Sequence, residues 1–419
     1  MRNRETLRSR WSWLLSLVVL APLLVACGSG GGSANTDDDA IARNDATTSA
    51  ETQAVDPAPT EPISNLGMTD VIPVRLSTDE IQQIKPNELG RIPILMYHAF
   101  TTDPKFLDEW TVTTDQFRAH LQWLYDHDFY VVPLADLVNN EISAPPGKHP
   151  VVLTFDDASS GQFRLLKDDQ GAFYPDPITA VGIMEEFFAA HPDFGHTALF
   201  AVVPTTCFQK SGEVSTCEER LTWLAENGYE IANHTWWHQD LSQANDELLM
   251  QQIGETKIWI DERVTGAANL SSVLVLPFGA FPSYDWQMDY LYSGFVWGGQ
   301  TIQLSAVVLV GGGPASSPSS GPWTRWAIPR FNTDPEGWGH WTETMNSPEY
   351  ALYTSDGNPG TVTIPDPIPE DIAAQYDAEW ASDYGMQVIR YTPGAAGGDG
   401  EGESGHGLPV PVAHTGRRQ

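Results

Sequence analysis

The sequence predicts an α/β fold whose parallel strands present functional side chains at one edge of the sheet. Strand-like and helix-like patterns alternate from residue 92 onward, which is typical of repeated βα units with helices outside. An apolar, β-branched run at residues 151–155 leads directly into two adjacent acids, Asp156 and Asp157. A second strand-like segment, at residues 230–233, is followed by a pair of histidines, His234 and His238. Because parallel α/β folds hold their chemistry at the carboxyl ends of strands, both groups are expected at the same edge.

The first 27 residues predict an export signal. Four arginines precede an apolar run at residues 11–26. This run is shorter than the ~20 residues of a spanning helix, so it is typical of a signal-peptide core. It ends in Leu24-Val-Ala-Cys27, which resembles a bacterial lipobox. We therefore expect an extracytoplasmic protein anchored to the bacterial membrane by a lipid on Cys27; an ordinary signal sequence with a chance cysteine, or an uncleaved anchor, is the alternative.

The rest of the chain is expected to hold one large domain between two flexible segments. Residues 28–62 are rich in Gly, Ser, Thr, Asp, Ala and Pro and cannot bury enough apolar surface to fold. We assign residues 28–90 to an acidic, flexible linker, in which residues 63–90 are transitional. A catalytic domain is expected at 91–391, and a Gly-rich, disordered tail at 392–419.

Apolar periodicity places the individual elements of the domain. Strands are predicted at residues 92–97, 129–132, 151–155, 197–203, 230–233 and 273–276. Helices are predicted at residues 113–125, 134–138, 178–190, 221–227 and 246–264. Residues 173–177 are expected to form an inserted loop or hairpin, and residues 346–391 a closing hairpin or strand. Periodicity alone does not separate a closed barrel from an open doubly wound sheet.

The histidine pair, His234 and His238, has the spacing of two metal ligands. Residues four apart lie on one face of a helix or helical turn and can hold one ion. Two imidazoles and one carboxylate leave a fourth position for water, as in catalytic zinc sites. A carboxylate outside the metal shell can then accept a proton from that water. A solvated Asp-Asp turn and two surface histidines are the alternative, and either signal alone is weak.

Together these residues resemble the polysaccharide deacetylases, the NodB-homology domain of carbohydrate esterase family 4. Thr154-Phe-Asp-Asp157 is similar to the first motif of that family, and His234-Thr-Trp-Trp-His238 to the second. The resemblance extends from Ile92 to about Arg330. It implies a distorted (β/α) barrel of the NodB-homology type with fewer than eight units.

The resemblance also implies roles for the residues of the two motifs. Asp156 corresponds to the catalytic base of the family. Asp157, His234 and His238 correspond to its metal ligands, and zinc is the default expectation among several divalent ions.

Two departures from the family pattern affect the expected chemistry. The third motif, Val275-Leu-Pro-Phe-Gly279, lacks the arginine that orients the catalytic acid, and Arg330 is a candidate replacement. No Leu-x-His follows near the C-terminus to supply a general acid. His98, at the end of the first predicted strand, is a candidate for that role, with a buried, hydrogen-bonded histidine as an equal alternative.

Substrate binding is expected to involve the third motif and aromatic side chains. Pro277, Phe278, Trp237 and Arg330 are the candidate substrate-binding residues, with the Phe278 backbone N–H as a donor to the oxyanion, as in the family. Tryptophans exceed what a core requires, so some are expected to line a glycan cleft, although core packing is the better expectation for any single one. They are Trp236, Trp237, Trp286, Trp297, Trp323, Trp326, Trp338 and Trp341.

The expected function is a metal-dependent hydrolase that removes acetyl groups from a polysaccharide, N-acetylated amino sugars above all. An O-acetyl esterase and a catalytically impaired carbohydrate-binding lipoprotein are the alternatives. A formal net charge of −33 argues against nucleic acid as a partner, because little would neutralise phosphates. Cys207 and Cys217 are expected to form a disulfide in an exported protein, with two free thiols as the alternative.

Overall fold

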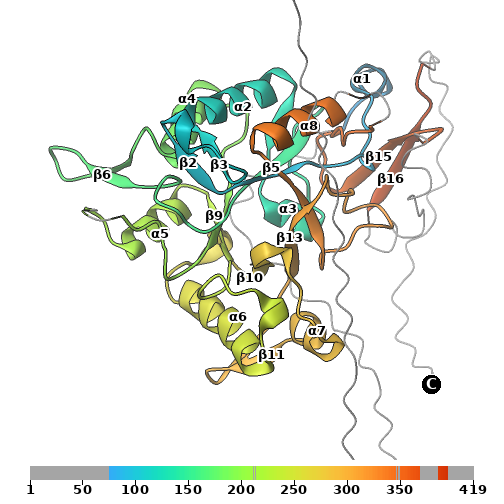
Figure 1. Cartoon of the computed structure of the whole chain (residues 1–419). Coiled ribbons are helices and arrows are strands. Elements are labelled where there is room, and N and C mark those ends of the chain that lie inside the picture. The colour runs from blue at the N-terminus through green and yellow to red at the C-terminus, as the bar shows by residue number, and fades with distance from the viewer. Residues whose placement is uncertain are drawn as a thin grey trace, which may run out of the picture. The chain divides into compact units, whose positions relative to one another are not determined.

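Seven parallel strands close into a barrel in the computed structural model (Figure 1). The structure describes residues 75–368, apart from 211, 213, 346, 348 and 349, together with residues 386–394. The order of strands around the barrel is β1-β14-β13-β10-β9-β8-β5, and β5 pairs again with β1. These strands are β1 (Ile94–Tyr97), β5 (His149–Phe155), β8 (Leu199–Val202), β9 (Glu230–Asn233), β10 (Asn269–Val275), β13 (Ala306–Gly312) and β14 (Ile328–Asn332). An eighth strand, β4 (Phe129–Val131), pairs in parallel with β5 outside the ring.

The closed ring confirms the predicted distorted barrel with fewer than eight units. Because β1 hydrogen-bonds to both β14 and β5, the open doubly wound sheet is excluded. The distortion lies at two places where the register shifts, between β9 and β10 and between β13 and β14.

Side chains alternate between the inside and the outside of the barrel, as the period of a β-strand requires. Val152, Ala201 and Val275 pack in one apolar cluster with inward-facing residues of other strands. Their neighbours Leu153 and Phe200 belong to a second cluster, which also contains apolar residues of the covering helices. The residues of the first cluster are buried, so the barrel is a packed core.

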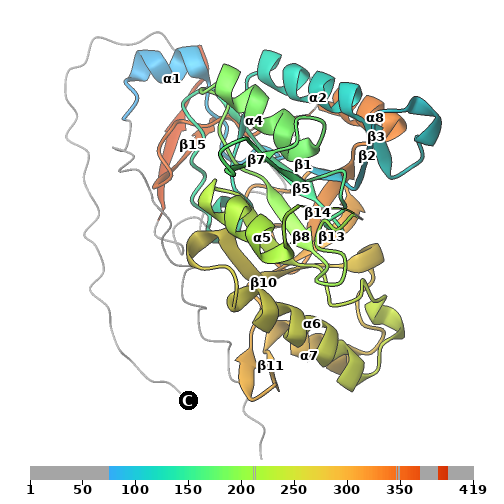
Figure 2. The ribbon, with the colours of Figure 1, turned by 90° about the vertical axis from the view of Figure 1, so that its left-hand side faces the viewer.

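Eight helices of the described residues surround the barrel. They are α1 (Thr78–Ile84), α2 (Thr114–Asp126), α3 (Leu134–Asn139), α4 (Ala180–Ala190), α5 (Cys217–Glu226), α6 (Asp246–Asp261), α7 (Asp285–Tyr292) and α8 (Pro335–Met345). Figures 1 and 2 show α2, α4 and α8 together on one side, and α6 with α7 on the opposite side. A capping box begins α2: the Thr113 hydroxyl accepts from Gln116 N–H, and the Gln116 side chain accepts from Thr113 N–H. None of the helices described is long and apolar enough to span a membrane.

Short strands and single helical turns lie outside the barrel, in the segments that connect its strands and helices or follow them. The short strands are β2 (Ala99–Thr101), β3 (Thr111–Thr113), β6 (Leu165–Lys167), β7 (Phe173–Pro175), β11 (Phe295–Trp297), β12 (Gln300–Ile302), β15 (Thr361–Pro365) and β16 (Gln387–Tyr391). The 3₁₀ turns are η1 (Pro104–Phe106), η2 (Leu241–Gln243), η3 (Gly266–Ala268) and η4 (Pro277–Gly279). Strands β6 and β7 form an antiparallel hairpin, which is the insertion expected near residues 173–177.

The C-terminal part differs from the expectation. Strands β15 and β16 pair in parallel and form a sheet of their own, so they are neither a hairpin nor a strand of the barrel. Two parallel strands need a crossover between them, and a hairpin turn cannot provide one.

The N-terminal boundary of the packed domain also differs from position 91. Residues 75–90, expected to belong to the linker, contain α1, and Glu88 and Leu89 are buried. Glu88 accepts from the backbone N–H of Asp356 and Thr363, which fixes this segment against β15. The expected signal peptide with Cys27, and most of the expected tail, lie outside the described residues.

Candidate active site

The candidate catalytic residues gather at the carboxyl end of the barrel. Asp156 and Asp157 follow β5, His234 follows β9 and His98 follows β1. Since β5 is adjacent to β1 on one side and separated from β9 only by β8 on the other, the parallel topology brings these positions to one rim.

Asp157, His234 and His238 form a group that fits a divalent cation. Asp157 Oδ1 lies 3.3 Å from Nε2 of His234 and 3.3 Å from Nε2 of His238. One ligand atom from each of the three residues lies within 4.8 Å of the others. The Nδ1 of His234 lies 2.8 Å from the carbonyl oxygen of Val275, and a carbonyl only accepts, so Nδ1 carries the proton.

This hydrogen bond leaves Nε2 of His234 unprotonated, as a metal ligand must be. The side chain is 1% exposed, yet Nε2 has no hydrogen-bond partner. A buried acceptor without a partner normally costs stability. A cation bound beside Asp157 would satisfy it, so the donor set is consistent with a metal site.

The segment from His234 to His238 is an irregular loop, whereas the spacing suggested a helical turn. Thr235 and His238 have positive φ angles of 63° and 57°. Two other residues of the site, Asp157 and Phe278, have φ angles of 77° and 60°. Left-handed backbone is rare for residues other than glycine and gathers at functional sites, where the surrounding structure fixes it.

Two polar side chains hold the histidine loop in this conformation. Asn233 Oδ1 accepts from Thr235 N–H at 3.0 Å, while its amide donates to the carbonyl oxygen of Ile253. The fully buried Gln252 accepts from Trp237 N–H through Oε1 at 2.9 Å, and its backbone carbonyl accepts from Trp236 N–H. Sequence analysis missed both residues, because no motif marks the amide of Asn233, at the end of β9, or that of Gln252, on α6, as a support of the histidine loop.

Asp156 is bound by Arg330 through two parallel hydrogen bonds. Nη1 and Nη2 donate to Oδ1 and Oδ2, each at 2.7 Å, and both side chains are buried. Arg330 also donates to the Thr154 hydroxyl and to the Leu309 carbonyl. The structure thus places Arg330 where the missing arginine of the third motif would act. Being buried, it contacts the carboxylate and is not placed to contact a substrate, contrary to its expected role in substrate binding.

The electrostatic surroundings keep Asp156 ionised. Burial alone would raise its pKa, but the charge of Arg330 and its hydrogen bonds hold the pKa of this carboxyl far below its usual range. Its Oδ2 lies 3.9 Å from His234 Nε2 and 3.8 Å from His98 Nε2. The carboxylate therefore faces the space between the two imidazoles.

His98 borders the same space, at the opposite side from the histidine loop. Its side chain is 13% exposed, and Nδ1 is buried without a hydrogen-bond partner. Burial lowers the pKa of His98, and the charges of Asp156 and Asp157 only partly offset this. Gln162 donates to the backbone carbonyl of His98 at 2.7 Å and so joins the loop after Asp157 to the end of β1. Gln162 is a further site residue that sequence analysis missed.

The candidate substrate-binding residues divide into exposed and buried ones. Trp237 is 51% exposed and Phe278 is 62% exposed. The Phe278 ring lies edge-on to His238, with ring centroids 4.6 Å apart, so it borders the metal-ligand group directly. Pro277 is buried beneath it and shapes the turn, so it is not placed to contact a substrate as expected.

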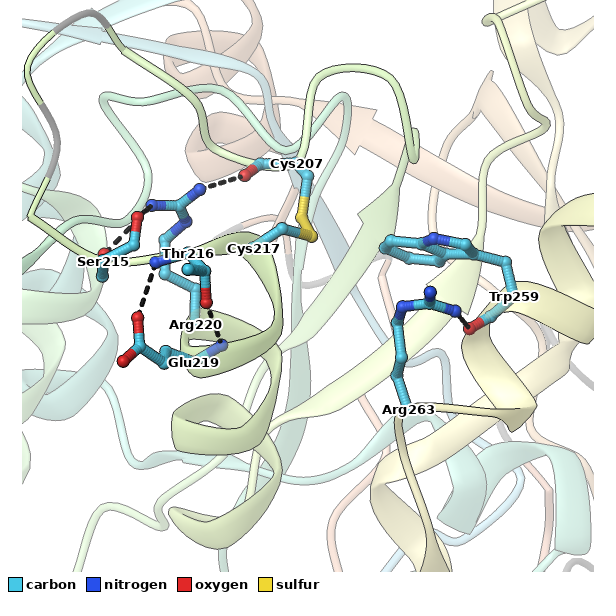
Figure 3. The surroundings of a disulfide bond; sticks show 8 residues. All are labelled: Cys207, Ser215, Thr216, Cys217, Glu219, Arg220, Trp259 and Arg263. Atoms are coloured by element: carbon cyan, nitrogen blue, oxygen red, sulfur yellow. Dashed lines mark hydrogen bonds between the residues drawn. A yellow bond between two sulfur atoms is a disulfide. The ribbon is translucent and has the colours of Figure 1, made fainter.

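A disulfide joins the loop that follows β8 to the first residue of α5 (Figure 3). Cys207 and Cys217 are bonded, as expected. Arg220, on α5, donates to the carbonyls of Cys207 and Ser215 in the loop that the disulfide closes. Phe208, which follows Cys207, donates its N–H to the carbonyl of Ala158. Ala158 comes directly after the metal-ligand candidate Asp157.

Comparisons with known proteins agree with this geometry. The family model "Polysaccharide deacetylase" matches residues 201–289, a segment that contains both histidines and Phe278. No curated protein matches the chain in sequence.

Solved structures of deacetylases show limited similarity. The Streptococcus pyogenes deacetylase PplD is 21% identical, with a TM-score of 0.45, over 61% of this chain and 99% of that one. IcaB from Ammonifex degensii is 16% identical, with a TM-score of 0.40, over 61% and 97%. A de-N-acetylase from Aggregatibacter actinomycetemcomitans is 17% identical, with a TM-score of 0.41, over 60% and 99%. Residues 201–289 of this chain, with His234 and His238, thus match the family model of the polysaccharide deacetylases.

Proposed function

We propose that the protein is a metal-dependent hydrolase that removes acetyl groups from N-acetylated amino sugars of a polysaccharide. One observation carries the proposal: a cation-binding group, Asp157 with His234 and His238, lies beside an ionised carboxylate, Asp156, that is not part of it. A ligand group for a Lewis acid next to a separate base is what hydrolysis of an unactivated amide requires.

Zinc is the metal that we propose, because two imidazoles and one carboxylate are its usual catalytic ligands. When bound, the ion supplies Lewis-acid chemistry, which polarises the acetyl carbonyl and acidifies water. Asp156 accepts a proton from the attacking water. Arg330 keeps this carboxylate ionised and fixes its plane. The backbone N–H of Phe278, at the end of β10, donates to the oxygen on which negative charge develops.

His98 is the proposed general acid, which gives a proton to the departing amine. Its Nε2 lies 3.8 Å from Asp156 Oδ2, and His98 is not one of the three metal-ligand candidates. The pKa of His98 is lowered by burial, so only a small part of it is protonated at neutral pH. This observation favours a second candidate function, an O-acetyl esterase, because an alkoxide leaves with less need of a proton than an amine does.

We also propose that the protein acts outside the cytoplasm, anchored to the bacterial membrane through a lipid on Cys27. The arginine-flanked apolar run and the lipobox-like Leu24-Val-Ala-Cys27 support this. Metabolic labelling with a radioactive fatty acid tests it. Cys27→Ala should lose the label, and a labelled variant would contradict the anchor.

The function is tested by acetate release from N-acetylglucosamine oligomers and from an acetylated xylan, with metal content measured on the same sample. We expect release from the oligomers, about one zinc ion per chain, and loss of release in Asp156→Asn with the metal retained. Release from the xylan alone would establish the esterase. Bound metal without release from either substrate would point to a carbohydrate-binding protein, and absence of metal would contradict the ligand assignment.

His98 is tested by the same assay. His98→Ala should lower release from the amide substrate while metal content stays unchanged. Unchanged turnover would remove His98 from the mechanism.

A further inference from the structure

The tryptophans singled out in the sequence differ greatly in exposure. Trp341 is fully buried, whereas Trp237 and Trp286 are 51% and 55% exposed. Trp237 belongs to the histidine loop, so its exposure is explained by the site already described. Trp286 lies in the first turn of α7, and that site does not account for its exposure.

Trp286 is half of an exposed aromatic pair with a fixed orientation. Its ring stacks on Tyr284, with centroids 4.3 Å apart and planes 14° from parallel, and Tyr284 is 52% exposed. The indole N–H lies 3.4 Å from Asp246 Oδ1. Asp246 also accepts from Gln287 at 2.8 Å and from Tyr290 at 3.1 Å, so the carboxylate is itself fixed.

Ordered exposure of this kind requires an explanation. A large apolar side chain that stays exposed at the surface is stabilised little by packing. It therefore normally keeps its rotamer freedom. Here one face of each ring is covered by the other, and each residue nevertheless stays about half exposed. A rigid, open aromatic face loses little entropy when a ligand stacks on it, which makes it suited to binding.

The pair belongs to the same rim of the barrel as the catalytic residues. The segment that carries it starts at Phe278, whose ring contacts His238, and leads into α7. Ser283 donates to the carbonyl of Ser242, four residues after His238. The loops after β9 and β10 are thus bonded to each other next to the aromatic pair, and Figures 1 and 2 show α7 lying beside α6 there.

We propose that Tyr284 and Trp286 bind a further sugar ring of the substrate polymer, outside the catalytic centre. This inference rests on the proposed function and extends it to the length of substrate that the protein recognises. Pyranose rings have an apolar C–H face that packs on an aromatic ring, and their hydroxyls hydrogen-bond to neighbouring acids. Asp246 and Asp285 supply such acids, and their negative charge also suits amino sugars that have already lost their acetyl group.

The test compares substrates of different length. Acetate release is measured on N-acetylglucosamine oligomers of two and of six units with the wild type, Trp286→Ala, Trp286→Phe and Tyr284→Ala. We expect kcat/KM for the hexamer to fall about five-fold or more in both alanine variants, and kcat/KM for the dimer to stay unchanged. Trp286→Phe keeps a ring but loses the indole N–H, and should lie between the wild type and Trp286→Ala.

Tyr292→Ala is the matched control, since Tyr292 is an exposed aromatic residue at the other end of α7, packed against Trp326. It should leave both substrates unaffected. Equal effects of Trp286→Ala on dimer and hexamer, or no effect on either, would overturn the inference.

A binding measurement separates this inference from the proposed function. Calorimetric titration of Asp156→Asn with the same two oligomers should show tighter binding of the hexamer, and the added substitution Trp286→Ala should abolish the difference. If neither the wild type nor any variant releases acetate, the proposed function fails. The titration then still decides whether Tyr284 and Trp286 bind sugar. Thermal unfolding of each variant verifies that it is folded.

Discussion

Arg330 and Asp156, which are 174 residues apart in the sequence, form a buried ion pair with two hydrogen bonds of 2.7 Å. The arginine lies in β14, which β1 separates from β5 in the order of strands, and its side chain reaches the carboxylate after β5. In this chain the charge that stabilises the proposed base thus comes from a different strand than the third motif. The site keeps the interaction although Val275 occupies the place of the usual arginine.

Removal of Arg330 should affect both stability and activity. Arg330→Met leaves a buried carboxylate without its cation, and we expect a loss of about 3–5 kcal/mol in the free energy of unfolding. The raised pKa of Asp156 should also abolish most acetate release. Arg330→Met combined with Asp156→Asn should recover part of the stability and none of the activity. Chemical denaturation and the acetate assay measure the two effects.

Arg118→Met is the control for this prediction. Arg118 forms a pair with Glu186 at the same distance of 2.7 Å, but at the surface. Its loss should cost no more than about 1 kcal/mol. Similar losses of unfolding free energy in Arg330→Met and Arg118→Met would mean that the buried pair with Asp156 contributes no more to stability than a surface pair.

Gln252 should be required for the conformation of the histidine loop. Gln252→Met keeps the size of the side chain but removes the acceptor of Trp237 N–H. We expect zinc affinity to fall about ten-fold, as is typical when a support of a metal ligand is lost. Competitive zinc titration measures it. Gln251→Met, which only removes a bond to Glu255 on the same helix, should bind zinc as the wild type does.

Glu230 should make the stability of the fold depend on pH. Burial raises the pKa of Glu230 to about 8, against the opposing effect of hydrogen bonds from the N–H groups of Ala135 and Leu134. Because the pKa of Glu230 is higher in the folded than in the unfolded state, protonation of this residue stabilises the folded state. This stabilisation is complete below about pH 4.5 and is lost as pH rises towards 8. The slope should be at most about 1.4 kcal/mol per pH unit.

Glu230→Gln removes this titration and should flatten the decline of stability between about pH 5 and 8. Urea denaturation at several pH values measures it. Glu226→Gln, a substitution of an exposed acid on α5, should follow the wild-type curve. A wild-type decline that persists unchanged in Glu230→Gln would refute the assignment to Glu230.

Reduction of the disulfide should loosen the region next to Asp157. The bond closes a loop with a sequence separation of 10 residues, for which chain entropy predicts a contribution of about 2–3 kcal/mol. Reductant should lower the melting temperature of the wild type. The variant Cys207→Ser/Cys217→Ser should already melt at the lower temperature and respond no further to reductant.

Continuous buried strands and the two motifs could be predicted from the sequence. The run before Asp156 becomes β5, because it is apolar enough to be covered on two faces, and the segment before His234 becomes β9, although Glu230 and Asn233 are polar. Closure of the barrel could not be predicted from periodicity, because it depends on pairing between β1 and the distant β14. The resemblance to a known family supplied that part of the expectation.

The local conformation of the site was harder to predict. The spacing of His234 and His238 is compatible with a helix, and only the bonds from Asn233 and Gln252 select the irregular loop. Exposure was also beyond prediction, since Trp286 and Trp341 are equally apolar in the sequence. What separates them is that Trp341 packs against aromatic residues of other elements, whereas Trp286 stacks on Tyr284, two residues away in the sequence.

Closure of the ring by β14 has a consequence for the order in which the protein matures. During synthesis β5 leaves the ribosome long before β14, so the nascent chain holds Asp156 without a cation to pair with it. We expect this carboxylate to become a competent base only when the last strand of the ring docks beside β1. A chain that ends before residue 328 should therefore be inert even where its zinc ligands are complete. The enzyme would thus gain activity at the end of its folding, in one step with the completion of its barrel.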